Sequence, residues 1–146
     1  MRQTIKRLTP QPVWDAARKA YFWGLYAREW PKAALHPYRR ASIRRLAAYK
    51  DTHKGQRCVI IGNGPSLKNT DISRIKTEYT FGMNRIYLAF PDWGFETSYF
   101  VSINDLVIEQ CADDIRSLAI PKFLSWHSHR YIEPTDDTMF LHTTYY

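Results

Sequence analysis

The sequence predicts an α/β protein with a Rossmann-like, mostly parallel sheet behind a basic helical extension. Two observations support this class. Short apolar runs recur after residue 58, and helical or turn segments separate them. The charge is also divided. Residues 1–57 hold 14 Lys and Arg against 3 Asp and Glu, whereas residues 58–146 hold 7 against 11. We therefore expect an extension over 1–56 and a sheet domain over 57–146.

Two helices are expected in the extension. Apolar residues recur at helical spacing in segment 13–30, and Pro31 should end or kink this helix. The second helix covers 38–50. Its apolar residues should share one side and its arginines should lie largely on the other: Ile43, Leu46 and Ala47 against Arg39, Arg40, Arg44 and Arg45.

The mixture of aromatic and basic residues in segment 13–50 has three interpretations. It could lie on the inner-membrane surface, because Trp and Tyr favour the headgroup zone and Arg favours anionic lipid. It could grip nucleic acid, although no recognised motif supports this and we consider it unlikely to be the partner. The favoured interpretation is a helical hairpin that packs its aromatic side chains on the sheet domain.

The sheet domain should contain five strands. The run "CVIIG" from Cys58 lacks polar alternation, which suits a strand buried on both faces. The other strands are expected over 79–84, 98–104, 121–126 and 138–143. A helix should lie between Asn104 and Pro121, because apolar residues recur there at helical spacing and Asn104 or Asp105 can cap its start.

Several classes of protein are disfavoured by the composition. The two cysteines, Cys58 and Cys111, form no disulfide framework and are expected to be buried thiols. No apolar run approaches the ~20 residues of a membrane helix, and the N-terminus does not resemble a secretory signal. A cytoplasmic location is therefore expected, peripheral at the inner membrane if the extension docks there.

The segment Gly62-Asn63-Gly64-Pro65-Ser66 follows the first strand and should begin a helix. The glycines allow a tight reversal and a close approach of ligand to backbone, and Pro65 suits the first helical position. The N–H groups of Ser66 and Leu67 would then point out of a helix N-terminus, where anions bind. Asn63 adds an amide for a ribose or base edge. The alternative is a purely structural turn.

Two known phosphate motifs do not fit this turn. It lacks the Lys-Ser/Thr pair of a P-loop, and Leu67 stands where the dinucleotide fingerprint requires its last glycine. Asn84 and Asn104 end the next two expected strands. Because ligands of open α/β sheets bind beyond the carboxyl ends of the strands, we expect these residues to share a site with Asn63. Turn formation is the alternative for all three.

The phrases "IIGNGPSL", "TDISRI" and "MNRIYL" resemble the N-terminal half of two related groups. One group is the bacterial CMP-sialic acid-dependent sialyltransferases. The other is built around the archaeal 6-hydroxymethylpterin diphosphokinase and includes flagellin-glycosylation factors. The sequence of residues 57–126 is more similar to the second group, and the basic extension lies outside the resemblance.

This resemblance assigns nucleotide-binding residues by position. In the sialyltransferases the glycine-rich turn holds the nucleotide of CMP-sialic acid, and the asparagine that ends the second strand faces the nucleotide sugar. Transferred to this chain, the set is Gly62, Asn63, Gly64, Pro65, Ser66, Asn84, Asn104 and Asp105. The catalytic residues of the sialyltransferases come from their later half. We therefore expect this chain to be part of a longer protein, with its sheet incomplete and its catalytic base elsewhere.

The expected function is a nucleotide-dependent transferase, most readily a glycosyltransferase that uses a CMP-linked sugar for surface-glycan or flagellin modification. The alternative within enzymes is pyrophosphate transfer from ATP with Mg²⁺, for which Asp105 is the one candidate metal ligand. A non-catalytic nucleotide-binding or membrane-docking fragment is the alternative of another class. His127 and His129 lack further ligands at matching spacing, and Asp113-Asp114 is expected to be a solvated helix face.

Overall fold

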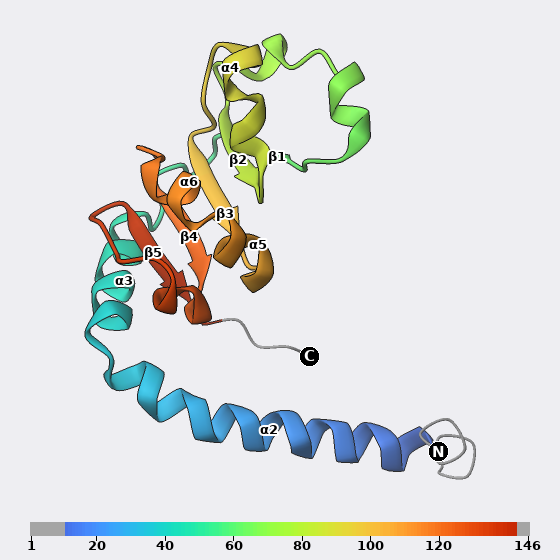
Figure 1. Ribbon diagram of the computed structural model, residues 1–146, viewed down its shortest axis with the longest axis vertical. Coiled ribbons are helices and arrows are strands. Elements are labelled where there is room, and N and C mark those ends of the chain that lie inside the picture. The colour runs from blue at the N-terminus through green and yellow to red at the C-terminus, as the bar shows by residue number, and fades with distance from the viewer. Residues whose placement is uncertain (1–10, 143–146) are drawn as a thin grey trace. The chain divides into compact units, whose positions relative to one another are not determined.

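The computed structural model describes residues 11–142, and the chain forms two compact units (Figure 1). Of the described residues, 11–36 belong to one unit and 37–142 to the other. The division falls before the second helix, not near residue 56. Residues 37–56 therefore belong with the sheet, because the second helix packs against its last strand.

Helix α2 (Gln11–Leu35) is the described part of the first unit. It is longer than expected, because it continues past Pro31 to Leu35; of the two outcomes expected at this proline, an end or a kink, the end is wrong. Large apolar side chains along it are exposed: Val13, Trp14, Tyr21, Phe22, Trp23, Leu25, Trp30 and Leu35. Within residues 11–142, no helix combines the length and apolar character needed to cross a bilayer.

The second unit is built on a five-stranded sheet in which every pairing is parallel. All five expected strands form, and the predicted α/β Rossmann-like class is confirmed. The strands are β1 (Cys58–Ile61), β2 (Tyr79–Met83), β3 (Tyr99–Ser102), β4 (Lys122–Ser125) and β5 (Thr138–Leu141).

The strands lie side by side in the order of the sequence, from β1 to β5. Because parallel crossovers are right-handed, such an order places every connection on the same face of the sheet. Figure 1 shows α5 and α6 over one face. The connecting elements are η1 (Pro65–Asn69), η2 (Ser73–Ile75), η3 (Ile86–Ala89), α4 (Phe90–Trp93), α5 (Asp105–Gln110), α6 (Ala112–Ser117) and η4 (Trp126–Arg130).

The face under the connections is well packed. The register aligns Phe100, Leu124 and Phe140 on it, and all three are buried. Ile108 and Ile115 from α5 and α6 are also fully buried. The expected helix after Asn104 is thus present, although it is split into two short pieces at Cys111.

The opposite face is covered by α3 (Pro37–Ala48) over only part of its width. Tyr99, Phe123 and Met139 form a cluster there, against which Leu46 and Tyr49 pack. The face that was predicted for the second helix is therefore partly wrong, because Ile43 and Ala47 are exposed. The side chains in α3 and just after it that contact the sheet are Ser42, Arg45, Leu46 and Tyr49.

Side chains of α3 also occupy the free edge of β5. The Ser42 hydroxyl accepts a hydrogen bond from the Phe140 N–H at 2.9 Å, and Arg45 donates to the Thr138 carbonyl at 3.1 Å. Two backbone groups of an edge strand therefore have partners, which makes this edge a poor template for pairing with another chain.

Strand β1 forms the other edge and is more open than its sequence predicts. Ile60 is 71% exposed and Cys58 is exposed, so two expectations were wrong, that β1 is buried on both faces and that Cys58 is a buried thiol. The cause is its edge position together with the narrow coverage by α3. Strand β4, between two neighbours, is buried at all four positions, and Cys111 is buried as predicted.

One glycine of β2 is required by packing. A Cβ atom at Gly82 would lie 2.5 Å from the Ile86 side chain and 2.7 Å from the Thr97 hydroxyl. These distances are below any ordinary contact, so η3 and the chain before β3 pack against β2 only because this side chain is absent.

Candidate functional site

Residues that follow the strands meet at one edge of the sheet, because all five strands are parallel. The turn 62–66 follows β1, Asn84 follows β2, and Asn104 with Asp105 follows β3. This shared edge was the basis for grouping them. Two hydrogen bonds now connect neighbouring strands there, one from Ser102 to Asn84 and one from Ser125 to Asp105.

The turn after β1 begins a 3₁₀-helix of five residues, η1, and not the α-helix that was expected. Pro65 occupies its first turn as predicted. The Leu67 N–H donates to the Gly64 carbonyl at 3.1 Å, so it is not one of the free amides at a helix start. The Ser66 N–H makes no hydrogen bond with any residue in the range 11–142. One of the two amides assigned to an anion is therefore occupied.

The two glycines of the turn have no structural need to be glycine. Neither adopts a positive φ, so the expected tight reversal is not what they provide. Nothing lies within 4 Å of a Cβ atom built at Gly62, and at Gly64 only the Ser66 hydroxyl does, at 3.9 Å. The backbone here is bare, and open space lies beside it. Asn63 is also exposed, without a hydrogen bond to any described residue.

Asn84 has a fixed position at the end of β2. Its backbone is left-handed, with φ at 53°, a conformation that asparagine tolerates better than most residues. Its N–H donates to the Val101 carbonyl at 3.0 Å, and its Oδ1 accepts from the Ser102 hydroxyl at 3.1 Å. The amide NH₂ group of Asn84 remains as a donor at the edge. Asn84 is thus both a turn former and an oriented polar group, so the two interpretations are compatible.

Asn104 is the N-cap of α5. Its Oδ1 accepts from the Leu106 N–H at 3.2 Å and from the Val107 N–H at 3.5 Å. These bonds satisfy two backbone donors that the helix start leaves open. The side-chain oxygen of Asn104 is therefore used in capping α5, which is the local role expected of this residue.

Asp105 is held by the neighbouring strand. Its Oδ1 accepts a hydrogen bond from the Ser125 hydroxyl, and the Ser125 carbonyl in turn accepts from the Ser128 hydroxyl at 2.5 Å. Ser125 and Ser128 are both fully buried. One carboxylate oxygen of Asp105 has no partner among the described residues. Ser102 and Ser125 were not recognised in the sequence as part of this edge, and only the sheet register reveals them.

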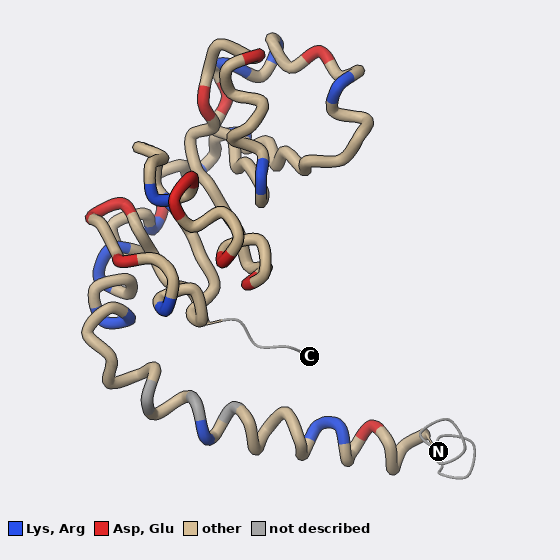
Figure 2. The backbone as a smooth tube through the Cα atoms, viewed as in Figure 1, with Lys and Arg blue, Asp and Glu red and all other residues tan. Residues whose placement is uncertain are grey.

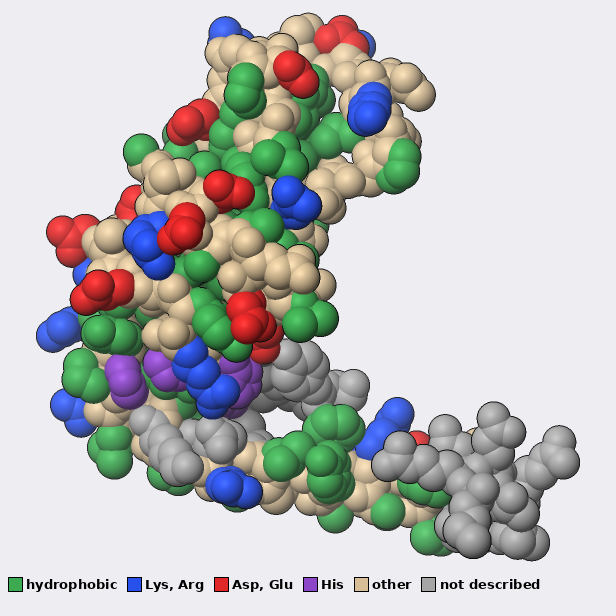
Figure 3. Space-filling model, viewed as in Figure 1, with side chains coloured by type: hydrophobic (Ala, Val, Ile, Leu, Met, Phe, Trp, Pro, Cys, Tyr) green, Lys and Arg blue, Asp and Glu red, His purple; other side chains and the backbone are tan. Residues whose placement is uncertain are grey.

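Basic groups lie beyond the ends of β4 and β5. Burial lowers the pKa of His142, and the nearby charges of Arg39 and His127 lower it further. The Arg39 Nε atom is buried and has no hydrogen-bond partner within the described chain. Figure 3 shows histidine side chains beside Lys and Arg side chains on one surface of the molecule. This set was missed because its members are far apart in sequence.

The other histidine of interest, His129, is anchored. Its Nδ1 lies 2.6 Å from the Trp126 carbonyl, and its ring stacks on Trp126 with centroids 4.2 Å apart. No group of three or more metal-binding side chains occurs within residues 11–142. A Mg²⁺ ion at Asp105 would therefore depend on the phosphates of a substrate for its other ligands.

No protein-family model, curated protein or solved structure matches this chain.

Proposed function

We propose that the protein is a nucleotide-dependent transferase whose donor, a nucleotide-activated sugar, binds at the carboxyl edge of the sheet. The observation that carries this proposal is the bare backbone at Gly62 and Gly64. Two glycines with ordinary φ values and open space beside them offer a surface on which a flat base, a ribose or a phosphate could lie closely. The resemblance to CMP-sialic acid-dependent enzymes makes a CMP-linked donor the favoured case.

Each group at the edge has a role in this proposal. The Ser66 N–H and hydroxyl would donate to a donor phosphate and stabilise the charge that develops on it as the sugar leaves. Asn63 and the NH₂ group of Asn84 would orient the ribose and base. The Ser102 hydroxyl bond keeps the Asn84 amide in one orientation, which lowers the entropy lost when a ligand binds.

A thermal-shift series with CMP, CDP, UDP, GTP and ATP, with and without Mg²⁺, tests this proposal. A nucleotide at ten times its Kd stabilises the fold by about 1.4 kcal/mol, which is about 4 °C in Tm for a chain of this size. A shift with CMP supports sialyl-type transfer. A shift with ATP that requires Mg²⁺ supports pyrophosphate transfer through Asp105 instead. The absence of any shift contradicts nucleotide binding.

Substitutions in the turn after β1 test whether the nucleotide binds there. Gly62→Ala should fold normally, since its Cβ meets nothing within 4 Å, and should bind the same nucleotide at least tenfold more weakly. Asn63→Ala should also weaken binding, whereas Asn69→Ala is the matched control at the exposed end of η1. Unchanged affinity in Gly62→Ala and Asn63→Ala would remove the ligand from this turn.

A further inference from the structure

One cationic side chain of the sheet unit is partly buried without an anion beside it. The Nε atom of Arg39 is buried and has no hydrogen-bond partner in residues 11–142, and Arg39 forms no ion pair with a carboxylate of this part of the chain. Buried polar groups are nearly always paired, and leaving a charged donor unpaired is costly. The orphaned guanidinium therefore indicates a partner other than the described side chains.

The contacts between α3 and β5 show where Arg39 lies. Two hydrogen bonds align the helix with the strand: Arg45 with the Thr138 carbonyl at 3.1 Å, and Ser42 with the Phe140 N–H at 2.9 Å. Three residues back along the helix thus correspond to two residues forward along the strand, and these steps have comparable lengths, about 4.5 and 6.6 Å. The next step of the same alignment pairs Arg39 with His142, the first residue after β5.

The connection after β4 lies over the same end of the sheet. The last residues of β4 and β5 are aligned, so η4 begins beside His142. The Trp126 ring packs against Phe140 with centroids 6.3 Å apart, which holds η4, and with it His127, near the end of β5. Burial lowers the pKa of His142, and the charges of Arg39 and His127 lower it further, so the three cationic groups interact with one another.

The elements that carry these three residues contain no acidic side chain. Segments 37–50, 126–132 and 138–142 have no Asp or Glu, and Figure 2 marks the arginines along α3 in blue. The N-terminus of α3 also lies at this end of β5, so the helix dipole adds to the positive potential. An anion is favoured here, and a dianion gains more from several positive charges than a monoanion does.

We propose that Arg39, His127 and His142 bind a phosphate group beyond the carboxyl ends of β4 and β5. The guanidinium fork offers parallel N–H donors to two phosphate oxygens, and an imidazole N–H can donate to a third. Four strand spacings, about 19 Å in all, separate β5 from β1. The proposal therefore does not depend on nucleotide binding at the turn after β1.

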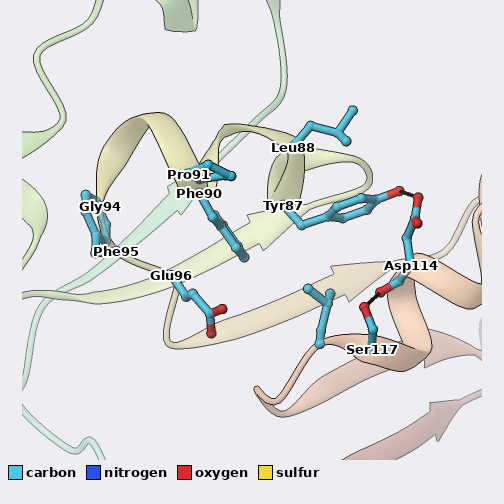
Figure 4. Close-up of a pocket in the computed structure, with 10 residues that line it drawn as sticks. Tyr87, Leu88, Phe90, Pro91, Gly94, Phe95, Glu96, Asp114 and Ser117 are labelled. Carbon is cyan, nitrogen blue, oxygen red and sulfur yellow. Dashed lines mark hydrogen bonds between the residues drawn. The ribbon is translucent and has the colours of Figure 1, made fainter.

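The hollow between η3, α4 and α6 is not a competing phosphate site (Figure 4). Its charged lining residues are Glu96 and Asp114, whose carboxylates repel an anion. The backbone amide signals of this hollow, such as those of Gly94 and Ser117, are therefore internal controls for a phosphate titration.

NMR of the imidazole rings of the full chain, titrated with inorganic phosphate at pH 6.5 and constant ionic strength, tests the proposal. The His127 and His142 signals should shift saturably. The His53 signals should not, because this ring contacts Tyr79 at the amino end of β2. Acetate, a monoanion, should bind at least fivefold more weakly. Equal binding of acetate, or the absence of saturable shifts at His127 and His142, would overturn the proposal.

Methyl phosphate in place of inorganic phosphate distinguishes the two sources of a phosphate group. Binding as tight as that of inorganic phosphate, or tighter, supports a site for the phosphate of an ester. Binding at least tenfold weaker supports a site for free phosphate, in which every oxygen is enclosed.

Substitutions test the role of each side chain. Arg39→Gln should weaken phosphate binding at least tenfold, and His142→Gln about threefold to fivefold. Arg40→Gln is the matched control, because it removes the same charge from the adjacent, exposed position of α3. Arg39→Lys keeps the charge but loses the Nε donor, so its affinity should be intermediate. An equal loss of affinity in Arg40→Gln and Arg39→Gln would reduce the effect to general charge and contradict the site.

Thermal unfolding separates a binding role of Arg39 from a structural one. Phosphate at ten times its Kd should raise the Tm of the unsubstituted chain by about 4 °C and leave that of Arg39→Gln unchanged. Without phosphate, Arg39→Gln should unfold at the same temperature or higher, since it removes an unpaired buried donor. A lower Tm of Arg39→Gln combined with unchanged phosphate affinity would show a structural arginine and overturn the proposal. If Arg39→Gln does not fold, the affinities of Arg39→Lys and His142→Gln decide the question.

Discussion

The buried ion pair between Lys122 and Asp137 should make a large and measurable contribution to stability. The Lys122 side chain is only 1% exposed, at the start of a strand that is buried throughout. Its Nζ donates to Asp137 Oδ2 at 2.7 Å and to the Leu118 and Ile120 carbonyls at 2.6 and 3.3 Å. All three protons of the ammonium group therefore have oxygen partners, and one of these partners carries the balancing charge.

Asp137→Ala leaves this ammonium buried beside two neutral carbonyls. Removing one partner of a fully buried pair costs about 3–5 kcal/mol. Here the Asp137 side chain is 30% exposed and the two carbonyls remain, so we expect a smaller loss, about 2–3 kcal/mol in the free energy of unfolding. Lys122→Met keeps most of the apolar stem and returns Asp137 to water, which should cost only about 1–2 kcal/mol.

Urea denaturation of the two single variants and the double variant measures this interaction. In the double variant no charge is stranded, so its stability should lie within ~0.5 kcal/mol of Lys122→Met alone, giving a coupling energy of about 2 kcal/mol. Asp136→Ala is the neighbouring control. It removes an exposed pair with Arg45 and should cost less than ~0.5 kcal/mol. Additive single effects, or a loss in Asp137→Ala no larger than in Asp136→Ala, would refute the reasoning.

The ion pair between Lys122 and Asp137 should also make the stability of the fold depend on pH. Burial by itself would raise the pKa of Asp137, but the hydrogen bonds from Lys122 and Thr135 and the Lys122 charge hold this pKa below its usual value. A carboxyl whose folded pKa is depressed stabilises the fold above its unfolded pKa, near 3.9, and this stabilisation is lost as the pH falls further. Asp137→Asn should therefore flatten the loss of stability below about pH 4.

Three further predictions concern packing, an edge strand and a histidine. Gly82→Ala should destabilise the fold by about 2–3 kcal/mol in urea denaturation, because its Cβ overpacks a buried contact, whereas Gly62→Ala should change stability by less than ~0.5 kcal/mol; similar values for both would contradict the packing argument. Ser42→Ala leaves the buried Phe140 N–H without its acceptor and should cost about 1–3 kcal/mol by the same measurement. In an NMR titration, the His142 imidazole should have its midpoint below pH 6.5, because burial and nearby positive charge lower its pKa. Since the pKa is lower in the folded than in the unfolded chain, the stability contribution of neutral His142 is lost as the pH falls below 6.5. A midpoint at or above pH 6.5 would contradict these effects of burial and charge.

The strands were predictable because each one is a short apolar run that ends at a polar residue. All five strands were placed correctly in the sequence. In β3, β4 and β5 the degree of burial also agrees with the apolar pattern. The failure at β1 has a physical reason. A continuous apolar run such as "CVIIG" indicates that a strand can be buried on both faces, but the strand order decides whether anything covers it, and Ile60 is exposed.

The helices show a second limit of local patterns. In α3, Ile43 is exposed whereas Ser42 is buried, because the edge of β5 needs a hydrogen-bond acceptor more than another apolar contact. Pro31 was expected to end or kink α2, but the helix continues past it to Leu35, so the expected end is wrong. A proline is compatible with a continuing helix that bends, and the sequence alone does not decide between the two outcomes.

The candidate site was predictable only where it is contiguous in sequence. The turn at Gly62–Ser66 and the strand-end residues could be named, since glycine, proline and asparagine have strong local preferences. Their hydrogen-bond partners, Ser102 and Ser125, could not, because each lies on a neighbouring strand whose register is fixed by long-range pairing.

The strand order also changes what the turn after β1 must do for a ligand. In a doubly wound sheet the first strand is central, and the reversal of strand order opens a crevice at its carboxyl end. Among the described strands the order runs without reversal, and β1 is an edge. A nucleotide at Gly62 would therefore have protein on one side only, unless it reaches across β2 toward Asn84. Binding that depends on Gly62 but not on Asn84 would describe a shallow edge contact with little specificity. Loss of binding in both Gly62→Ala and Asn84→Ala is what a donor-using transferase at this edge requires.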